Sequence, residues 1–578
     1  MNRREFLQLL AQASIAAQLA GCRSLATESG SDLYAVPAFG EARLLHITDT
    51  HAQLNPIYFR EPSVNIGIGA ASGKLPHLVG ENLLSRLPGL SEMESHAFTH
   101  LDFTAAAEKF GKIGGFAHLA TLINQLRGSA KGSLLLDGGD TWQGSGTALW
   151  TRGRDMVDAC NLLGVDVMTG HWEFTYREDE ILDNVAAFNG EFVGQNVLAT
   201  EDALFEGVEV YDEDSGHVFK PYVIKTVGAK RIAVVGQGFP YTPIANPARF
   251  IPNWTFGIRE SDLADLVAHI RGHEMPDAVV LLSHNGMDVD LKLASRVAGI
   301  DAILGGHTHD GVPMPVEVKN PGGTTIVTNA GSNGKFVGVL DLEFGAAGVS
   351  GYQYRLLPVF SNLIAADAEM QAYVDKAREP WLDQLREPLA ETDSLLYRRG
   401  NFNGSFDQVI VDALRSELDA EFSLSPGFRW GTSLLPGDTI TMEHVLDQTC
   451  ITYPETYVRD MKGSELKLIL ESVADNLFNV DPYYQQGGDM VRTGGLQYEC
   501  WPGAEMGHRI RNLESTSGQK IAADKDYRVA GWATVGNQST GPAIWDVVAD
   551  HLRDIRLVSL DEIETPLLRG VDGNPGMA

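Results

Sequence analysis

The sequence is poor in cysteine and in basic side chains for its length. Only 4 of its 578 residues are cysteine and none has CxxC spacing, which disfavours a disulfide framework and a redox or zinc-cysteine role. Lysine and arginine number 45 against 76 aspartates and glutamates, a formal net charge of −31. This charge disfavours nucleic acid and anionic membrane surfaces as partners. An anionic substrate must therefore be attracted by local positive charge, such as metal ions or a few arginines.

Long hydrophobic runs are also missing, because no apolar stretch reaches the roughly 20 residues of a membrane span. The first residues, MNRREFLQLLAQASIAAQLAGC, place Arg3 and Arg4 before a short, weakly apolar stretch, a pattern that resembles a twin-arginine export signal. Residues 1–30 are therefore expected to direct the chain to the periplasm. LAGC also resembles a lipoprotein cleavage box. Either Cys22 carries a lipid anchor, which would be the one membrane contact, or cleavage nearby leaves no lipid.

A chain of 578 residues is too long for one hydrophobic core, so two domains are expected. From about residue 42 to 344, apolar runs such as SLLLDGG and DAVVLLSH alternate with helical stretches, which predicts an α/β sandwich with buried strands. We assign a catalytic domain to residues 42–360. Residues 55–112 interrupt the alternation with glycine- and proline-rich sequence, and we expect an insertion near the mouth of the site.

The second half of the chain has its own organisation. Residues 361–395 are charged and helical in period despite two prolines, which predicts a linker helix. Residues 396–562 are expected to form a second α/β domain, followed by a tail at 563–578.

Side chains that can bind metal directly follow five of the predicted strands, in the blocks HITDTH, LDGGD, TGH, LLSH and GGHTH. Ligands in α/β sheets converge at the carboxyl ends of the strands, so these side chains are expected to meet. One such block alone is more often a capped turn or a solvated loop, but five in this order make coincidence improbable. The candidate ligands are Asp49, His51, Asp140, His171, His284, His307 and His309.

Two carboxylates and five imidazoles exceed what one ion needs and suit a two-metal site with a bridging carboxylate. Such a site holds its ions roughly 3.5–4 Å apart and directs a hydroxide at an anionic ester. We assign to the first metal Asp49, His51, Asp140 and His309. We assign to the second metal Asp140, His171, His284 and His307.

TGHWEFTY resembles the GNHEFD block of calcineurin-like metallophosphoesterases, in which the Asn binds metal and the His is a general acid. Those two positions are His171 and Trp172 here. GFRWGTSLLPGDTITMEHVLDQ (427–448) and KGSELKLILE (462–471) extend the resemblance to the 5′-nucleotidase family, across residues 42–562. The resemblance implies a four-layer α/β/β/α sandwich followed by a C-terminal α/β domain that recognises the substrate.

Within that family, YFREPSVNIG, GHWEFTY and GGDMVRTGG look like the SoxB-type thiosulfohydrolases of bacterial thiosulfate oxidation. This resemblance implies two manganese ions, although the ligand types would also accept zinc, iron or cobalt. It also implies that the substrate is a cysteine S-thiosulfonate on the carrier protein SoxYZ, near the flexible C-terminus of SoxY. Hydrolysis would then release sulfate.

Trp172 raises the question of what protonates the leaving group, because an indole cannot serve as a general acid. A persulfide anion is far less basic than the alkoxide that leaves a phosphate ester, so it can leave unprotonated. Trp172 is then expected to act in catalysis as an apolar wall beside the sulfur chain. Alternatively, Trp172 only fills space and Glu173 donates the proton.

Arg429 stands where the nucleotidase family has an arginine of its substrate pocket, and we expect it to offset charge on the sulfonate. Arg492 and Asp489, in GGDMVRTGG, are the other expected substrate-binding residues. A guanidinium can pair with a sulfonate in a bidentate manner. For either arginine the alternative is a structural salt bridge. We further expect the 55–112 insertion and the C-terminal domain to form a narrow entrance for an extended peptide.

Two other functions remain open from the sequence. A periplasmic 5′-nucleotidase or other metal-dependent phosphoesterase would use the same ligands, but Trp172 argues against it. A non-catalytic metal protein that only binds the carrier is the other alternative. Decay of an enzyme would be expected to remove some of the seven ligands, and none is missing.

Overall fold

The computed structural model describes residues 33–60, 65–99, 101–398 and 400–571. Contacts divide the chain into a unit Met1–Pro37 and a unit Ala38–Ala578, and the second unit carries all the elements described below. The predicted export signal at residues 1–30, with Cys22, lies outside the described residues. The three described cysteines are buried and unpaired. None of the described helices has the length and apolarity that a bilayer crossing needs.

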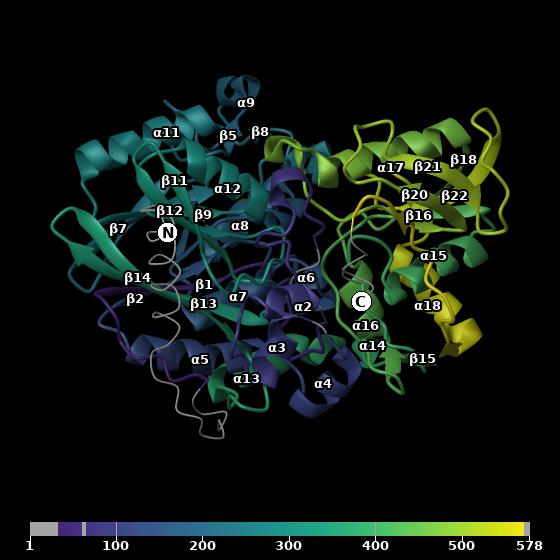
Figure 1. Ribbon diagram of the computed structural model, residues 1–578, viewed down its shortest axis with the longest axis horizontal. Helices are drawn as coiled ribbons and strands as arrows, with labels where there is room; N and C mark the ends of the chain where they lie inside the picture. The colour runs from purple at the N-terminus through teal and green to yellow at the C-terminus, as the bar shows by residue number, and fades with distance from the viewer. Residues whose placement is uncertain (1–32, 61–64, 100, 399, 572–578) are drawn as a thin grey trace, which may run out of the picture. The chain divides into compact units, whose positions relative to one another are not determined.

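Two six-stranded sheets form the centre of the N-terminal half of this unit (Figure 1). The first has the order β14 (Gly348–Pro358), β13 (Phe336–Gly345), β1 (Ala42–Ile47), β2 (Ser133–Asp137), β3 (Val167–Met168) and β4 (Glu191–Phe192). The second has the order β11 (Val316–Asn320), β12 (Gly323–Asn329), β10 (Ala302–Gly305), β9 (Ala278–Ser283), β7 (Lys230–Gln237) and β6 (Tyr222–Val227). The strands from β1 to β4 are parallel, and so are β7, β9, β10 and β12.

The two sheets pack face to face through apolar side chains. Leu44 and Leu136 of the first sheet share a buried cluster with Val280 and Leu304 of the second. The other face of the second sheet packs against α11 (Glu260–His269) and α12 (Met287–Arg296). On the far side of the first sheet lie α5 (Phe116–Gly128), α7 (Arg154–Leu163) and α13 (Ala368–Arg378) (Figure 1). This is the expected four-layer α/β/β/α sandwich.

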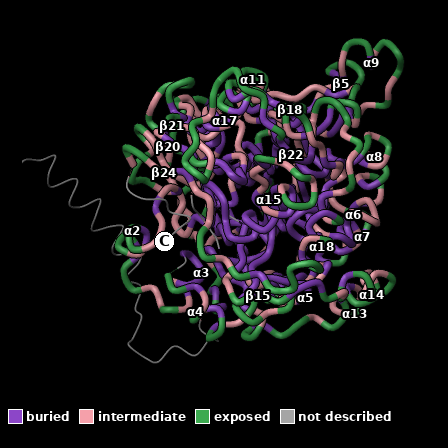
Figure 2. The backbone as a smooth tube through the Cα atoms, turned by 90° about the vertical axis from the view of Figure 1, so that its right-hand side faces the viewer, coloured by how far each residue is buried: buried purple, intermediate pink, exposed green. Residues whose placement is uncertain are grey.

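The C-terminal half is a second α/β assembly around its own core. A buried cluster joins α15 (Ser405–Glu417), α16 (Met442–Thr449) and α18 (Ile544–Ile555), and Figure 2 shows α15 among buried segments. The main sheet is β18 (Thr456–Lys462), β22 (Asp526–Trp532), β16 (Phe422–Ser425) and β19 (Arg492–Gly494), with α17 (Gly463–Phe478) beside it. Two smaller sheets accompany it. One has the order β17 (Thr439–Thr441), β15 (Pro388–Thr392), β23 (Leu557–Val558), and the other has the order β21 (Ile510–Ser515), β20 (Leu496–Cys500), β24 (Leu567–Leu568).

Residues 361–395 differ from the single linker helix that their period predicts. α13 ends at Arg378, a 3₁₀ turn follows at Glu379–Trp381, and α14 covers only Leu382–Leu385 before β15 begins. Pro380, inside the 3₁₀ turn, has no N–H to continue the helical hydrogen bonds. α13 also contacts α5 and α7, so it belongs to a layer of the sandwich.

The 55–112 insertion is more helical than its glycine and proline content suggests. Its described part contains α2 (Gly80–Leu84), α3 (Glu92–Phe98) and α4 (Phe103–Phe110). α3 begins with a capping box, because Ser91 accepts from the backbone N–H of Glu94 and Glu94 accepts from that of Ser91.

Outside the insertion, the remaining described α-helices are α6 (Gly146–Thr151), α8 (Glu178–Ala187), α9 (Glu201–Glu206) and α10 (Thr242–Ala245).

Candidate metal centre

The seven predicted ligands meet where the two sheets present the carboxyl ends of their parallel strands. Five loops, those after β1, β2, β3, β9 and β10, carry them. Each side chain is at most 7% exposed. They fall into the groups Asp140, His171, His284, His307 and Asp49, His51, Asp140, His309, and within each group the ligand atoms lie within 4.8 Å of one another. The structure therefore brings all seven together, in the two sets assigned from the sequence.

The backbone at this site is strained in a way that the sequence does not reveal. Five of the seven ligands have positive φ, a conformation that residues other than glycine rarely adopt. Such strain collects at functional sites, where the surrounding packing holds the backbone in place. The five are Asp49 (φ 52°), His51 (φ 47°), Asp140 (φ 58°), His307 (φ 72°) and His309 (φ 58°).

In the first group, donor atoms approach one another as they do around a shared cation. His51 Nε2 lies 3.0 Å from His309 Nε2 and 3.8 Å from Asp140 Oδ2. His309 Nε2 lies 3.2 Å from Asp49 Oδ1. Burial lowers the pKa of His51 to about 4, so its imidazole is neutral and able to donate a lone pair.

In the second group, Asp140 is the centre. Its Oδ2 lies 3.0 Å from His284 Nε2, and its Oδ1 lies 3.2 Å from His171 Nδ1. Burial by itself would raise the pKa of Asp140, but His171 and His284 outweigh it and hold that pKa well below the usual value. The other ring nitrogen of His284, Nδ1, lies 2.6 Å from the carbonyl oxygen of Gly138, a contact that orients the ring.

Two buried nitrogens in the second group lack any protein partner in the described structure, namely Nε2 of His171 and Nε2 of His307. A buried polar atom without a partner is costly and calls for a ligand, an ion or a water. Together with the shared carboxylate of Asp140, this donor set fits a dinuclear metal site.

Glu173 holds the loops of the site and does not reach the cavity. Its carboxylate accepts backbone N–H bonds from Asp140, Thr141, Trp142 and His171, at 2.7–3.1 Å. Burial raises its pKa. Both oxygens of Glu173 accept backbone N–H bonds beneath the ligands, which argues against the alternative in which Glu173 protonates the leaving group. The sequence did not predict this positioning role, because no motif around Glu173 indicates which backbone groups its carboxylate contacts.

Trp172 joins an aromatic wall beside the ligands. Its ring packs edge-on against Phe428 at 5.4 Å and Trp430 at 5.0 Å between centroids. Phe239 covers His171 at 4.0 Å. The backbone N–H of Trp172 donates to Asp140 Oδ1 at 2.7 Å. Phe239, Phe428 and Trp430 were not predicted, because they come from distant segments that no local motif connects.

Arg429 and Asp489 lie at the site. Arg429 donates to the carbonyl oxygens of His307 at 2.7 Å and Gly488 at 2.6 Å. It also contacts Asp489 Oδ1 at 3.4 Å.

The structure does not bring Arg492 to the cavity, which corrects its expected role in substrate binding. Its side chain is fully buried and lies 3.2 Å from Asp407 Oδ2 and 3.0 Å from Asp489 Oδ2. It also donates to the carbonyl oxygen of Gly400 at 3.0 Å. The guanidinium thus contacts residues of the C-terminal half, among them Asp489.

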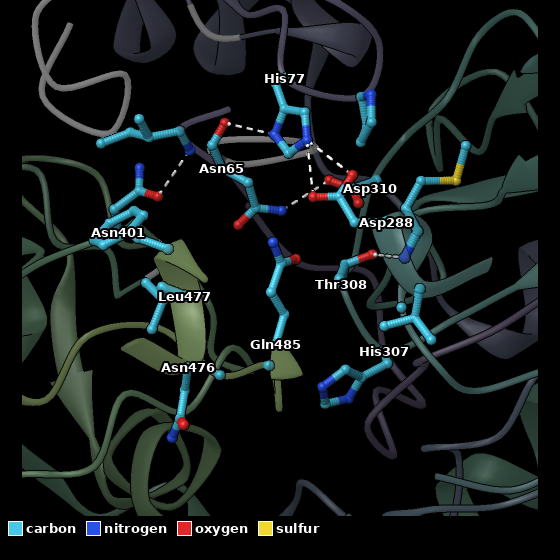
Figure 3. A pocket seen from close by; sticks show the side chains of 18 of the residues that line it. Asn65, His77, Asp288, His307, Thr308, Asp310, Asn401, Asn476, Leu477 and Gln485 are labelled. Carbon is cyan, nitrogen blue, oxygen red and sulfur yellow. Dashed lines mark hydrogen bonds and ion pairs between the residues drawn. The ribbon is translucent and has the colours of Figure 1, made fainter. Parts of the chain in front are cut away.

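Two cavities meet at His307. The larger, of about 180 Å³, is lined by His51, Asp140, His171, Trp172, Phe239, Tyr241, Ile244, Ala245, His307, His309, Pro426, Gly427, Phe428, Arg429, Trp430, Asn476, Gln486, Gly487, Gly488 and Asp489. The smaller, of about 50 Å³, has polar walls that include Asn65, His77, Asp288 and Asp310 (Figure 3). Described residues of the 55–112 insertion line only the smaller cavity. Residues of the C-terminal half such as Asn401 and Asn476 line the smaller cavity as well, so the insertion and the C-terminal half meet beside His307, and the entrance that they would share stays a prediction.

Comparison with known proteins identifies relatives of this chain. The 5′-nucleotidase C-terminal domain profile matches residues 390–549. The solved structure of the sulfate thiohydrolase SoxB of Thermus thermophilus, in complex with glycerol, is similar over 93% of this chain and 98% of that one. The identity is 34% and the TM-score 0.85. A 5′-nucleotidase precursor, also from Thermus thermophilus, shares the fold, with 21% identity and a TM-score of 0.71 over 92% of this chain and 100% of that one.

Curated relatives are nucleotide phosphoesterases. The trifunctional nucleotide phosphoesterase protein YfkN of Bacillus subtilis is 27% identical over 486 residues, 77% of this chain and 32% of YfkN. The chain thus spans about a third of that relative. The 5′-nucleotidase of Bos taurus is 25% identical over 458 residues, 72% of this chain and 76% of the bovine enzyme.

Proposed function

We propose that this chain, which belongs to the 5′-nucleotidase family of calcineurin-like metallophosphoesterases, hydrolyses a cysteine S-thiosulfonate on a SoxYZ-type carrier protein and releases sulfate. The observation that carries this proposal is Trp172. At the position where phosphoesterases of this superfamily are expected to have their acid, an indole forms part of the cavity wall. The similarity to the Thermus thermophilus sulfate thiohydrolase SoxB points to the same substrate class.

The overall reaction balances as Cys–S–S–SO₃⁻ + H₂O → Cys–S–S⁻ + SO₄²⁻ + 2H⁺. A water oxygen forms a bond to the terminal sulfur, the adjacent sulfur–sulfur bond breaks, and its electron pair leaves on the persulfide. Because a persulfide anion is only weakly basic, no acid is needed at the leaving sulfur. A phosphate ester instead releases a strongly basic alkoxide, for which a positioned acid contributes roughly 10²–10⁴-fold in rate.

Two divalent ions would be held by the seven ligands, and when bound they supply Lewis acidity and a nucleophilic water at neutral pH. We propose manganese for both. Asp140 orients the second group through His171 and His284. Arg429, on the cavity wall, adds positive charge that offsets the sulfonate.

The aromatic wall accounts for selectivity in this proposal. Trp172, Phe239, Phe428 and Trp430 give one side of the cavity an apolar surface suited to a chain of polarisable sulfurs. At about 180 Å³ the cavity admits a narrow peptide arm and excludes a folded protein. The arm of SoxYZ would therefore extend from its carrier into the site. A twin-arginine signal at residues 1–30 would place the enzyme in the periplasm with this partner.

The chain is also similar to nucleotide phosphoesterases, so hydrolysis of nucleotides by the same metal-binding residues is the alternative function. The deciding experiment measures sulfate release from thiosulfonated SoxYZ and phosphate release from nucleoside monophosphates, with protein of determined metal content. We expect a large preference for the carrier. Equal or faster hydrolysis of nucleotides would overturn the proposal. Turnover of neither substrate by metal-loaded protein would favour a non-catalytic carrier-binding role.

A further inference from the structure

Two neighbouring glutamines face different cavities. Gln485 lines the smaller cavity, where its side chain extends toward Asn65 (Figure 3) and its Nε2 donates to the carbonyl oxygen of Asn479 at 2.8 Å. Gln486 lines the larger cavity with the metal ligands. Its amide makes no hydrogen bond to any residue that the structure describes. The segment thus presents one amide that is bonded to the protein, at the smaller cavity, and one that is not, at the larger cavity.

A second amide without a protein hydrogen-bond partner comes from the last turn of α17. Asn476 borders both cavities, and Figure 3 shows its side chain pointing away from Asn65 and His77. Like Gln486, it has no hydrogen-bond partner within the described part of the chain. Asn476 and Gln486 are half-buried, so their amides remain accessible to a molecule in the cavity.

These two amides stand out because the rest of the wall offers few free polar groups. Trp172, Phe428 and Trp430 contribute an aromatic surface to the same cavity. Tyr241, also on the wall, already donates its hydroxyl to the carbonyl oxygen of Tyr483. Besides the metal ligands and the indole N–H of Trp430, which has no partner among the described residues, the wall of this cavity carries the side-chain amides of Asn476 and Gln486.

We infer that Asn476 and Gln486 bind the main chain of the peptide that carries the thiosulfonate, an inference that rests on the proposed function. A primary amide offers both donors and an acceptor, and each peptide group offers one of each. Recognition of main-chain groups suits an extended peptide, because it does not depend on the side chains of the peptide. The pair would thus set specificity for a peptide-linked substrate over a free thiosulfonate.

The test compares Asn476→Ala and Gln486→Ala with Gln485→Ala, a matched control of the same residue type one position away. Each protein is assayed with a short glycine-rich peptide bearing a cysteine S-thiosulfonate and with the free cysteine derivative. A hydrogen bond of ordinary strength predicts an increase in KM for the peptide of about 3- to 10-fold per amide. The increase should exceed that for the free derivative, and Gln485→Ala should match the wild type.

Three results would overturn the inference: equal effects on both substrates, an equal effect of Gln485→Ala, or no effect. Calorimetric binding of the unmodified peptide tests it without catalysis. Weaker binding by the two variants, with wild-type binding by Gln485→Ala, supports it even if the wild type releases no sulfate. In that case only the proposed reaction fails. If a nucleoside binds more tightly than the peptide, and if its binding depends on Asn476 and Gln486, the inference is wrong and the two amides bind a nucleobase instead.

Discussion

The guanidinium of Arg429 donates a 2.7 Å hydrogen bond to the backbone carbonyl oxygen of His307, joining two residues 122 positions apart. One belongs to the C-terminal half and the other follows β10 of the sandwich. Behind Arg429, a buried series of ion pairs continues through Asp489 and Arg492 to Asp407. The C-terminal half is thereby attached directly to a metal ligand.

Arg429→Lys should lower kcat/KM for the thiosulfonated carrier by about 10- to 100-fold. A lysine has no planar guanidinium and cannot make all the hydrogen bonds that Arg429 makes. Arg509→Lys is the matched control. Arg509 is also buried and bonded to a backbone carbonyl, that of Phe478 at 2.9 Å, but it lies away from the cavity. Both variants should lose thermal stability. If Arg509→Lys also lowers activity in proportion, Arg429 acts only through folding.

Asp140→Asn should remove most bound metal and abolish turnover, since this carboxylate contributes to both groups. Asp137→Asn is the control. Asp137 is also a fully buried aspartate, three positions before Asp140, but it belongs to neither group. Metal analysis by mass spectrometry is the measurement. Full occupancy with near-normal activity in Asp140→Asn would contradict the two-metal assignment.

Trp172→His should leave metal content intact, reduce sulfate release and introduce weak phosphoesterase activity. The change removes apolar contact to Phe428 and Trp430 and places a titratable group where the acid of phosphoesterases is expected. Trp150→His, on α6 against Trp381, serves as the control for loss of an indole elsewhere. A Trp172→His protein with undiminished sulfate release would show that the indole only fills space.

Gly487→Ala should distort the second group of ligands. A Cβ at this position, where φ is +76°, would lie 1.9 Å from His307 Nε2. Gly488→Ala imposes the same backbone strain at φ +77°, but its Cβ would have no neighbour nearer than 3.8 Å. We expect Gly487→Ala to lose metal and activity, and Gly488→Ala to lose only stability, about 1 kcal/mol. Equal metal content in the two variants would rule out the steric argument.

Removing metal should destabilise the folded chain, because ions that bind only the native state add their binding free energy to its stability. At a free metal concentration of 100 times Kd, one site contributes about 2.7 kcal/mol. Thermal unfolding with and without a chelator measures this, and Asp140→Asn should show a smaller difference than the wild type. An unfolding temperature that does not respond to the chelator would be incompatible with metal binding at this site.

The ligand set was predictable from the sequence because each ligand follows a buried strand directly. Asp49 and Asp140 are located by the apolar runs before them, and parallel strands bring their carboxyl ends to one edge. The α/β class follows from the same alternation. The helical insertion and the broken linker were less predictable, since short helices depend on capping and packing more than on composition.

The sequence by itself thus determined which residues can bind metal, because that information is carried by a few consecutive residues and by strand order. Only the tertiary structure decided that Arg492 is buried between Asp407 and Asp489 and that Gly487 packs against His307. The fold likewise decided that Gln485 lines one cavity and Gln486 the other. These contacts join segments far apart in the chain, and the direction of a side chain across such a distance depends on packing that no local pattern encodes.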